Sequence, residues 1–209
     1  MKKRLFSLVL ALTVAAGCLV GCGGSKSEKK ADATNSSEAG GEKILRVASE
    51  DPQVPLDMQL NTYSIIMKIT DNVTESLLLT NEKGELEPTL LEEMPTLSDD
   101  KLTYSFTLKD GVTFHNDAPL TSNDVKYSLQ RMVRKYKMSS LLEKVEGYQA
   151  YFDEQADEIT GIEIVDDKHF NIHMSEVYTP FLSALSTPYC AIYPAEALSL
   201  IHISEPTRH

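Results

Sequence analysis

Histidine and paired aspartate side chains are the groups in this sequence that could carry acid–base catalysis or bind a metal. His169 and His173 fall on one face of a predicted strand, but a rise of about 3.3 Å per residue separates them by about 13 Å, too far for a shared ion. The pairs Asp99–Asp100 and Asp166–Asp167 occupy predicted turns, where aspartate bonds to the local backbone. His115 precedes an Asn-Asp pair and is interpreted as a loop hydrogen-bonding residue.

Sequence motifs for catalysis are absent as well. The chain has no G-x-S-x-G nucleophile motif, no H-E-x-x-H zinc motif and no glycine-rich phosphate loop. We therefore predict no catalytic residue, no metal site and no cofactor, and a protein that is not an enzyme.

Cysteine chemistry is expected at one of the three cysteines. Cys22 ends the run Leu-Val-Gly-Cys, which resembles the lipobox of bacterial lipoproteins, with an apolar residue at −3 and a small one at −1. The resemblance implies cleavage before Cys22 and a thioether-linked lipid on its sulfur. Cys18 ends a poorer second match with alanine at −3. Cys190, in an apolar stretch, is predicted to be a small buried hydrophobe without a disulfide.

The first 43 residues are predicted to export and anchor the protein. Three basic residues and an uncharged apolar stretch make residues 1–21 a signal peptide. Residues 22–43 hold the lipidated cysteine and a tether that lacks aromatic and branched aliphatic residues. As a flexible coil the tether would reach about 25 Å. We expect a lipid-anchored protein on the extracytoplasmic face of the cell membrane.

Composition narrows the class of the remaining chain. The 209 residues are 42% hydrophobic and 24% charged, which is typical of a folded domain. The net charge of −11, from 31 acidic and 20 basic residues, argues against nucleic-acid binding because no basic surplus can replace phosphate counterions. Residues 198–208 resemble a translated sequencing adapter. Residues 198–209 are therefore predicted to be a non-native tail, and the natural chain is expected to continue past Ala197.

Hydrophobic periodicity predicts helices and strands in a mixed order between residues 44 and 197. Apolar residues three or four apart predict a helix over 62–78, and a Thr-x-x-Asp capping box predicts another from Thr121, with basic residues such as Arg131 near its C-terminus. A Thr-Pro pair starts a short helix that runs through Leu185. Strands are predicted over 44–49, 102–108, 112–114, 161–165 and 170–174, with turns at 81–84, 110–111 and 166–168. The fold class is α/β, as a mixed α+β body.

One continuous segment points to a family. Residues 97–131, LSDDKLTYSFTLKDGVTFHNDAPLTSNDVKYSLQR, resemble the signature region of the bacterial extracellular solute-binding proteins of the oligopeptide/dipeptide/nickel class, family 5. The resemblance covers residues 44–197. Lys101 and Asp117 stand where the family pattern has glycine, and Met94-Pro95 replaces its usual aromatic residue. These departures fall in turns and affect local geometry.

The resemblance implies a periplasmic-binding-protein type II-like fold, of which residues 44–197 are an incomplete first lobe. The implied function is that of the substrate-binding lipoprotein of an ABC importer, a monomer that captures oligopeptides or dipeptides and delivers them to the permease subunits. A receptor for nickel or another small solute stays open, as does a surface lipoprotein of the same fold that acts as an adhesin or peptide sensor without transport.

The family signature itself is expected to build the lobe and not to line the ligand cleft. The candidate ligand-binding residues lie after the first strand and near residue 190. They are Glu50, Asp57, Tyr63, Asn72 and Tyr189. A buried Asp57 could pair with the N-terminal ammonium of a peptide.

Overall fold

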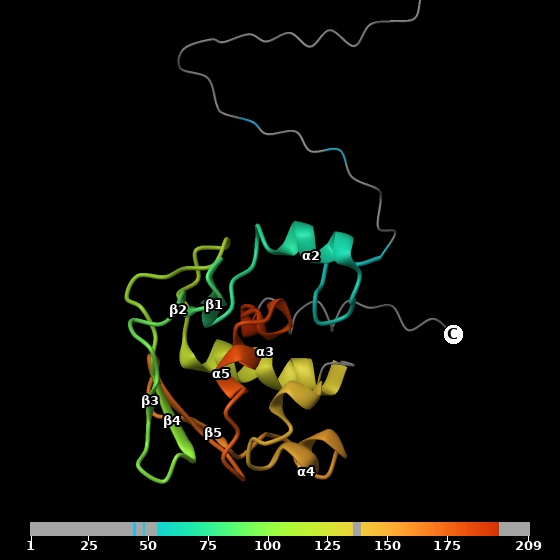
Figure 1. Cartoon of the computed structure of the whole chain (residues 1–209). Coiled ribbons are helices and arrows are strands. Elements are labelled where there is room, and N and C mark those ends of the chain that lie inside the picture. The colour runs from blue at the N-terminus through green and yellow to red at the C-terminus, as the bar shows by residue number, and fades with distance from the viewer. Residues whose placement is uncertain (1–43, 45–47, 49–53, 136–138, 197–209) are drawn as a thin grey trace, which may run out of the picture. The chain divides into compact units, whose positions relative to one another are not determined.

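The fold is taken from a computed structural model that describes residues 44, 48, 54–135 and 139–196 (Figure 1). The chain divides into two units between Val47 and Ala48, and the described residues from 48 onward belong to the second. Of the strand predicted over 44–49, the structure describes only residues 44 and 48, and the lipidation site Cys22 lies outside the described residues. The described part contains no helix that is both long enough and apolar enough to span a membrane.

Helices and two antiparallel sheets make up the described part of the second unit, in agreement with the mixed fold class. The larger sheet has the strand order β3-β4-β6-β5, and β1 pairs with β2 in a separate hairpin. In chain order the elements are α2 (Ser64–Thr70), β1 (Leu78–Thr80), β2 (Leu86–Pro88), β3 (Thr96–Leu97), β4 (Thr103–Thr107), α3 (Ser122–Lys135), η1 (Ser139–Leu142), α4 (Tyr148–Phe152), β5 (Ile162–Ile164), β6 (His169–His173), α5 (Phe181–Leu185) and η2 (Pro188–Cys190).

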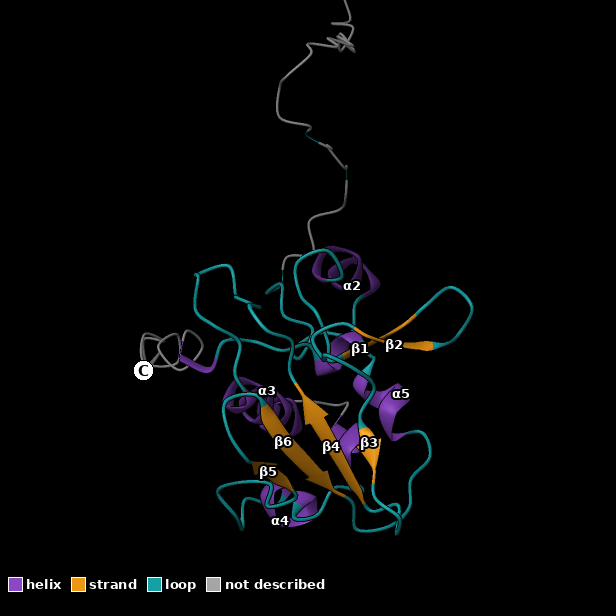
Figure 2. Ribbon diagram, turned by 90° about the vertical axis from the view of Figure 1, so that its left-hand side faces the viewer, coloured by secondary structure: helices purple, strands orange, loops and turns teal. Residues whose placement is uncertain are grey.

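The four-stranded sheet is apolar on one face and polar on the other. Along β4, Tyr104 and Phe106 are buried while Ser105 between them is exposed, as the strict alternation of the sequence predicts. Figure 2 shows the sheet in front of α3, so that the face turned away from this helix is toward the viewer. Such one-sided burial is typical of an antiparallel sheet with helices on a single face.

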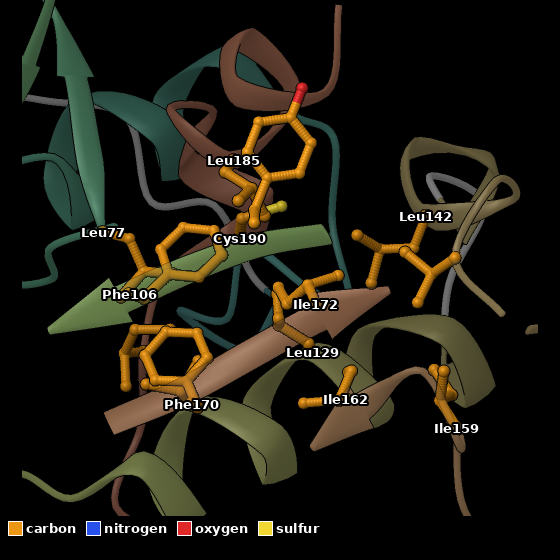
Figure 3. Close-up of a cluster of buried hydrophobic side chains, with 14 of the residues drawn as sticks. Leu77, Phe106, Leu129, Leu142, Ile159, Ile162, Phe170, Ile172, Leu185 and Cys190 are labelled. Carbon is orange, nitrogen blue, oxygen red and sulfur yellow. The ribbon is translucent and has the colours of Figure 1, made fainter. Parts of the chain in front are cut away.

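The hydrophobic core lies between this sheet and the helices α3 and α5 (Figure 3). The rings of Phe106 and Phe170, on the neighbouring strands β4 and β6, stack with centroids 4.7 Å apart. The ring of Tyr104 lies against the ring of Phe181 in α5, with 5.1 Å between their centroids. Leu129 of α3 and the free thiol of Cys190 are also fully buried, so the prediction of a buried Cys190 is confirmed.

The N-terminus of α3 is bound to the turn of the β5–β6 hairpin. The Asp124 carboxylate accepts hydrogen bonds from both the backbone N–H and the hydroxyl of Thr121, at 2.9 and 2.7 Å, which is half of the predicted capping box. The N–H of Ser122 donates to the carbonyl of Asp167 at 2.8 Å. The hairpin therefore satisfies a backbone donor that the helix leaves free.

Two predicted elements differ from the structure. The helix predicted over 62–78 ends at Thr70, because Asp71 caps it and the following residues form turns; Val73 is 52% exposed and does not continue the apolar face. The strand predicted over 112–114 is not formed. Instead this segment folds back on itself, with an isolated bridge from Thr113 to Pro119.

Candidate functional site

The segment 54–63 has some side chains in the interior and others in solvent. Met58 and Gln59 are fully buried, whereas Leu56, Leu60 and Tyr63 are 54%, 39% and 60% exposed. A short loop that leaves three large apolar side chains in water needs firm attachment on its buried side. Polar contacts with α3 supply that attachment.

Arg131 of α3 is the centre of these contacts. Its Nη2 atom lies 2.5 Å from Oδ2 of Asp57, and its Nη1 atom donates to Oε1 of Gln59 at 2.5 Å. The arginine side chain is 7% exposed and the aspartate side chain 17%. A charge this deeply buried is costly unless it is paired, so the two partners fix the position of segment 54–63.

Gln59 extends the cluster to the C-terminal part of the described chain. Its side-chain amide donates to the carbonyl of Ser128 at 2.9 Å and to that of Tyr189 at 3.4 Å. The Ser128 hydroxyl accepts the backbone N–H of Tyr193 at 2.8 Å. Burial raises the pKa of Tyr193 to about 12, with the nearby Asp57 carboxylate acting in the same direction. The Arg131 cluster (Asp57, Gln59, Ser128, Arg131 and Tyr193) therefore joins three distant segments.

The predicted ligand-binding residues divide between this cluster and the surface. Asp57 is bound by Arg131, so its carboxylate has a charged partner within the chain, and Tyr189 touches the cluster through its carbonyl. Tyr63 is the exposed N-cap of α2. The exposed Asn72 donates its side-chain amide to the carbonyl of Lys68 at 2.8 Å. Glu50 lies outside the described residues. Contact of any of them with a ligand stays a prediction.

Sequence reasoning missed Gln59, Arg131 and Tyr193. Arg131 was expected to complement the C-terminus of its helix, but the helix runs on to Lys135 and the guanidinium points to Asp57 instead. No local pattern marks this pairing. The only available signal was an arginine in the same helix as the buried-face residues Val125 and Leu129.

A hollow of about 450 Å³ lies beside the segment 71–75. We call it the 71–75 pocket. Of the predicted site residues that the structure describes, Asn72 alone borders it. Its lining comprises Asp71, Asn72, Val73, Thr74, Glu75, Leu90, Val112, Thr113, Phe114, His115, Leu120, Ile192, Tyr193 and Pro194. A second hollow of about 290 Å³ shares Asp71, Thr74 and Glu75 with it and extends toward Leu79 and Pro188.

Histidines on the β5–β6 hairpin form separate pairs with carboxylates. His169 Nδ1 lies 2.8 Å from Oδ1 of Asp166, and His173 Nε2 lies 3.0 Å from Oε2 of Glu163. Hydrogen bonds from Asn171 and His173 lower the pKa of Glu163, and bonds from the Lys168 backbone and from His169 lower that of Asp166. Among the described residues, no group of three or more histidine, cysteine or carboxylate side chains could hold a metal ion.

Comparison with protein families gives one match that covers more than half of the chain. The model of "bacterial extracellular solute-binding proteins, family 5 Middle" matches residues 85–203. The matched stretch begins in the β1–β2 hairpin and includes the four-stranded sheet and α3. It also overlaps the first six residues of the predicted non-native tail.

Individual relatives agree with this match. The dipeptide-binding protein DppE of Bacillus subtilis is 27% identical over 89% of this chain and 35% of its own length. The nickel-binding protein NikA of Staphylococcus aureus is 28% identical over 72% of this chain and 28% of its own length. The solved structure of the peptide pheromone receptor PrgZ superposes with a TM-score of 0.65 at 19% identity, over 69% of this chain and 29% of the receptor. The chain thus spans about a third of the length of these relatives.

Proposed function

Since the chain belongs to the bacterial extracellular solute-binding proteins of family 5, we propose that it is part of the substrate-binding lipoprotein of an ABC importer. In this proposal the full receptor captures oligopeptides or dipeptides outside the cell and delivers them to the permease subunits. The match over residues 85–203 carries the proposal, and the dipeptide-binding relative favours a peptide as solute.

The proposal assigns a role to each part of the chain. Residues 1–21 are the signal peptide, Cys22 carries the lipid, and 22–43 are the tether. Residues 44–197 are a part of the first lobe, and 198–209 are encoded by adapter sequence. A second lobe would follow in the natural protein, and closure of two lobes around a solute is a hinge motion.

Solute capture of this kind needs binding without chemical change. Pockets in such sites hold a ligand through a few placed polar groups and ordered water. Segment 54–63 supports this role, because the buried Arg131–Asp57 pair holds it while Leu56 and Tyr63 stay exposed. A backbone segment held in this way loses little further freedom when a ligand arrives.

The decisive experiment starts at the gene. The source locus is resequenced with long reads across the codon for Ala197, and the complete reading frame is expressed without residues 1–21. Isothermal titration calorimetry then measures the binding of a dipeptide mixture and of an oligopeptide mixture. We expect the receptor to bind peptides tightly and the peptides to be recovered unchanged. A complete receptor that binds neither mixture would contradict the proposal.

Nickel and sensor functions are separated in the same experiment. The nickel-binding relative makes nickel the first alternative solute, and binding of nickel in place of peptide would change the solute class. Loss of peptide uptake by cells that lack the gene supports transport. Unchanged uptake, together with peptide binding, would support a sensor or adhesin instead.

Lipid attachment is tested by metabolic labelling with a fatty-acid analogue. Cys22→Ser is expected to abolish labelling and release the protein from the membrane. The matched variant Cys18→Ser should retain the label, because its match to the lipobox is poorer. Equal labelling of both variants would contradict attachment at Cys22.

A further inference from the structure

The 71–75 pocket combines an apolar floor with an acidic rim. Leu90, Leu120 and Ile192 are at least nine-tenths buried and form part of its floor. Asp71 and Glu75 lie at its exposed edge. Its volume of about 450 Å³ falls within the range of small-molecule sites.

The charge at the rim is not compensated within the described structure. Neither Asp71 nor Glu75 takes part in an ion pair with any residue of 54–135 or 139–196. The residues that line the pocket include no lysine or arginine. Helix α2 ends at Thr70, so the negative end of its dipole adds to the same potential. The rim therefore attracts a cation.

The walls of the pocket are fixed by backbone hydrogen bonds. The N–H of Ile192 donates to the carbonyl of Glu75 at 2.9 Å, and this bond joins two walls of the pocket that are more than 100 residues apart in the sequence. A third wall is closed by the bond from the N–H of Leu120 to the carbonyl of Val112 at 3.0 Å. A ligand would enter a preformed hollow and would order little of the chain.

We propose that the 71–75 pocket binds an amphipathic cation, that is, a primary ammonium group attached to an apolar body. The apolar body lies against Val112, Leu120 and Ile192, and the ammonium group pairs with Asp71 and Glu75. This site is proposed in addition to the capture of a solute between two lobes. The same chemistry is offered by a free aryl-alkyl amine and by a lysine side chain next to an apolar residue in a polypeptide.

The test is a titration of the 209-residue chain, followed by NMR of its methyl groups. Phenethylammonium is the first probe, and 2-phenylethanol is its neutral counterpart. We expect a dissociation constant of about 1 mM for the cation, a value in keeping with the size of so small a ligand. Binding should shift the methyl signals of Val112, Leu120 and Ile192. Equal affinity for 2-phenylethanol, or shifts confined to Leu79 of the second hollow, would overturn the proposal.

A charge-removing variant tests the rim. Asp71→Asn combined with Glu75→Gln should raise the dissociation constant about tenfold, which corresponds to about 1.4 kcal/mol. Glu82→Gln with Asp99→Asn is the matched control, since it removes the same charges from exposed turns outside the pocket, and its affinity should equal that of the unsubstituted 209-residue chain. Equal weakening in both variants would show a nonspecific charge effect and overturn the site.

A capped dipeptide, acetyl-Phe-Lys-amide, distinguishes the two sources of the cation. Binding of both probes at the pocket supports a site for ammonium ligands in general. Binding of the dipeptide alone supports the site and assigns it to a polypeptide lysine. Absence of binding by both probes overturns the proposal.

Discussion

Arg131 and Asp57 stand 74 positions apart in the sequence and meet as a nearly buried ion pair, with Nη2 of the arginine 2.5 Å from Oδ2 of the aspartate. The same guanidinium binds Gln59, and its Cζ atom lies 5.7 Å from the ring centroid of Tyr193. One side chain of α3 therefore holds both the segment that precedes α2 and the segment that follows η2.

Removal of this arginine should be costly. Arg131→Met keeps much of the side-chain volume but leaves the Asp57 carboxylate and the Gln59 amide without their partner. We expect the free energy of unfolding to fall by about 3 kcal/mol, as found when one member of a buried pair is lost. Urea denaturation measures the change. Arg134→Met is the control, because Arg134 bonds a carbonyl at an exposed site and its loss should cost about 1 kcal/mol. Equal losses would contradict the role of Arg131.

Gly161 should tolerate no side chain. A Cβ atom at this position would lie 2.7 Å from the carbonyl oxygen of Glu146 and 2.8 Å from that of His173. These are backbone atoms held by hydrogen bonds among the same three residues. Gly161→Ala is expected to lower the free energy of unfolding by about 3 kcal/mol or to prevent folding.

Gly111 provides the comparison for Gly161. It has a φ of +71° but open space around the position of a Cβ, so Gly111→Ala should cost only about 1 kcal/mol of backbone strain. Thermal unfolding of the two variants measures the difference. A smaller loss for Gly161→Ala than for Gly111→Ala would contradict the close backbone packing.

Replacement of Lys101 by glycine should stabilise the protein. Its φ is +61°, in the left-handed region that side chains disfavour. Lys101→Gly removes this strain and is expected to raise the free energy of unfolding by about 0.5 kcal/mol, the strain relief being partly offset by the entropy of glycine. Lys83→Gly, at an exposed turn position with ordinary φ, should lower stability slightly. Chemical denaturation of both variants checks the sign, and a destabilised Lys101→Gly would contradict it.

Acid should weaken the β5–β6 hairpin through Glu163. Its pKa is held below the ordinary value of 4.5, mainly by the hydrogen bond from Asn171 and then by that from His173. A lowered carboxyl pKa gives stability that is present above pH 4.5 and is lost as the pH falls through the folded value. Asn171→Ala should therefore be less stable than the unsubstituted chain at pH 7, and the difference should shrink below pH 4.5.

The control for this pH dependence is Asn116→Ala. Asn116 accepts a hydrogen bond from the backbone N–H of Ala118 at 3.2 Å, and that bond involves no carboxylate. The effect of Asn116→Ala on the melting temperature should stay constant between pH 7 and pH 3. If the effect of Asn171→Ala were equally constant, Glu163 would not be the titrating group.

Elements whose signal is local could be predicted from the sequence. The alternation from Leu102 to Leu108, the turn at 81–84 and the hairpin around 166–168 all form as expected. The glycine pattern was informative even where glycine is absent. Lys101 and Asp117 replace glycine of the family pattern, and both have a positive φ. Both residues thus adopt the left-handed backbone conformation that glycine favours.

Elements that depend on distant contacts could not be predicted. The periodicity of Ile65, Ile66 and Ile69 continues by coincidence through Val73, but in the structure the helix gives way to a turn at 71–73. Likewise, the pairing of Arg131 with Asp57 has no local trace, because any acidic residue could be its partner. The charge and hydropathy of a residue favour one kind of surroundings for its side chain, whereas the residue that it pairs with is set by the tertiary fold.

The central strands of the larger sheet, β4 and β6, have a consequence for synthesis. Thr103 pairs with His173, 70 residues further along the chain, and α3, η1 and α4 lie in the intervening stretch. A chain growing from its N-terminus carries β4 with an unpaired edge until β6 has emerged. Unpaired edges are sites of aggregation, and contacts so distant in sequence form slowly. A chaperone that covers β4 during this interval would thus shield this unpaired edge of the nascent chain.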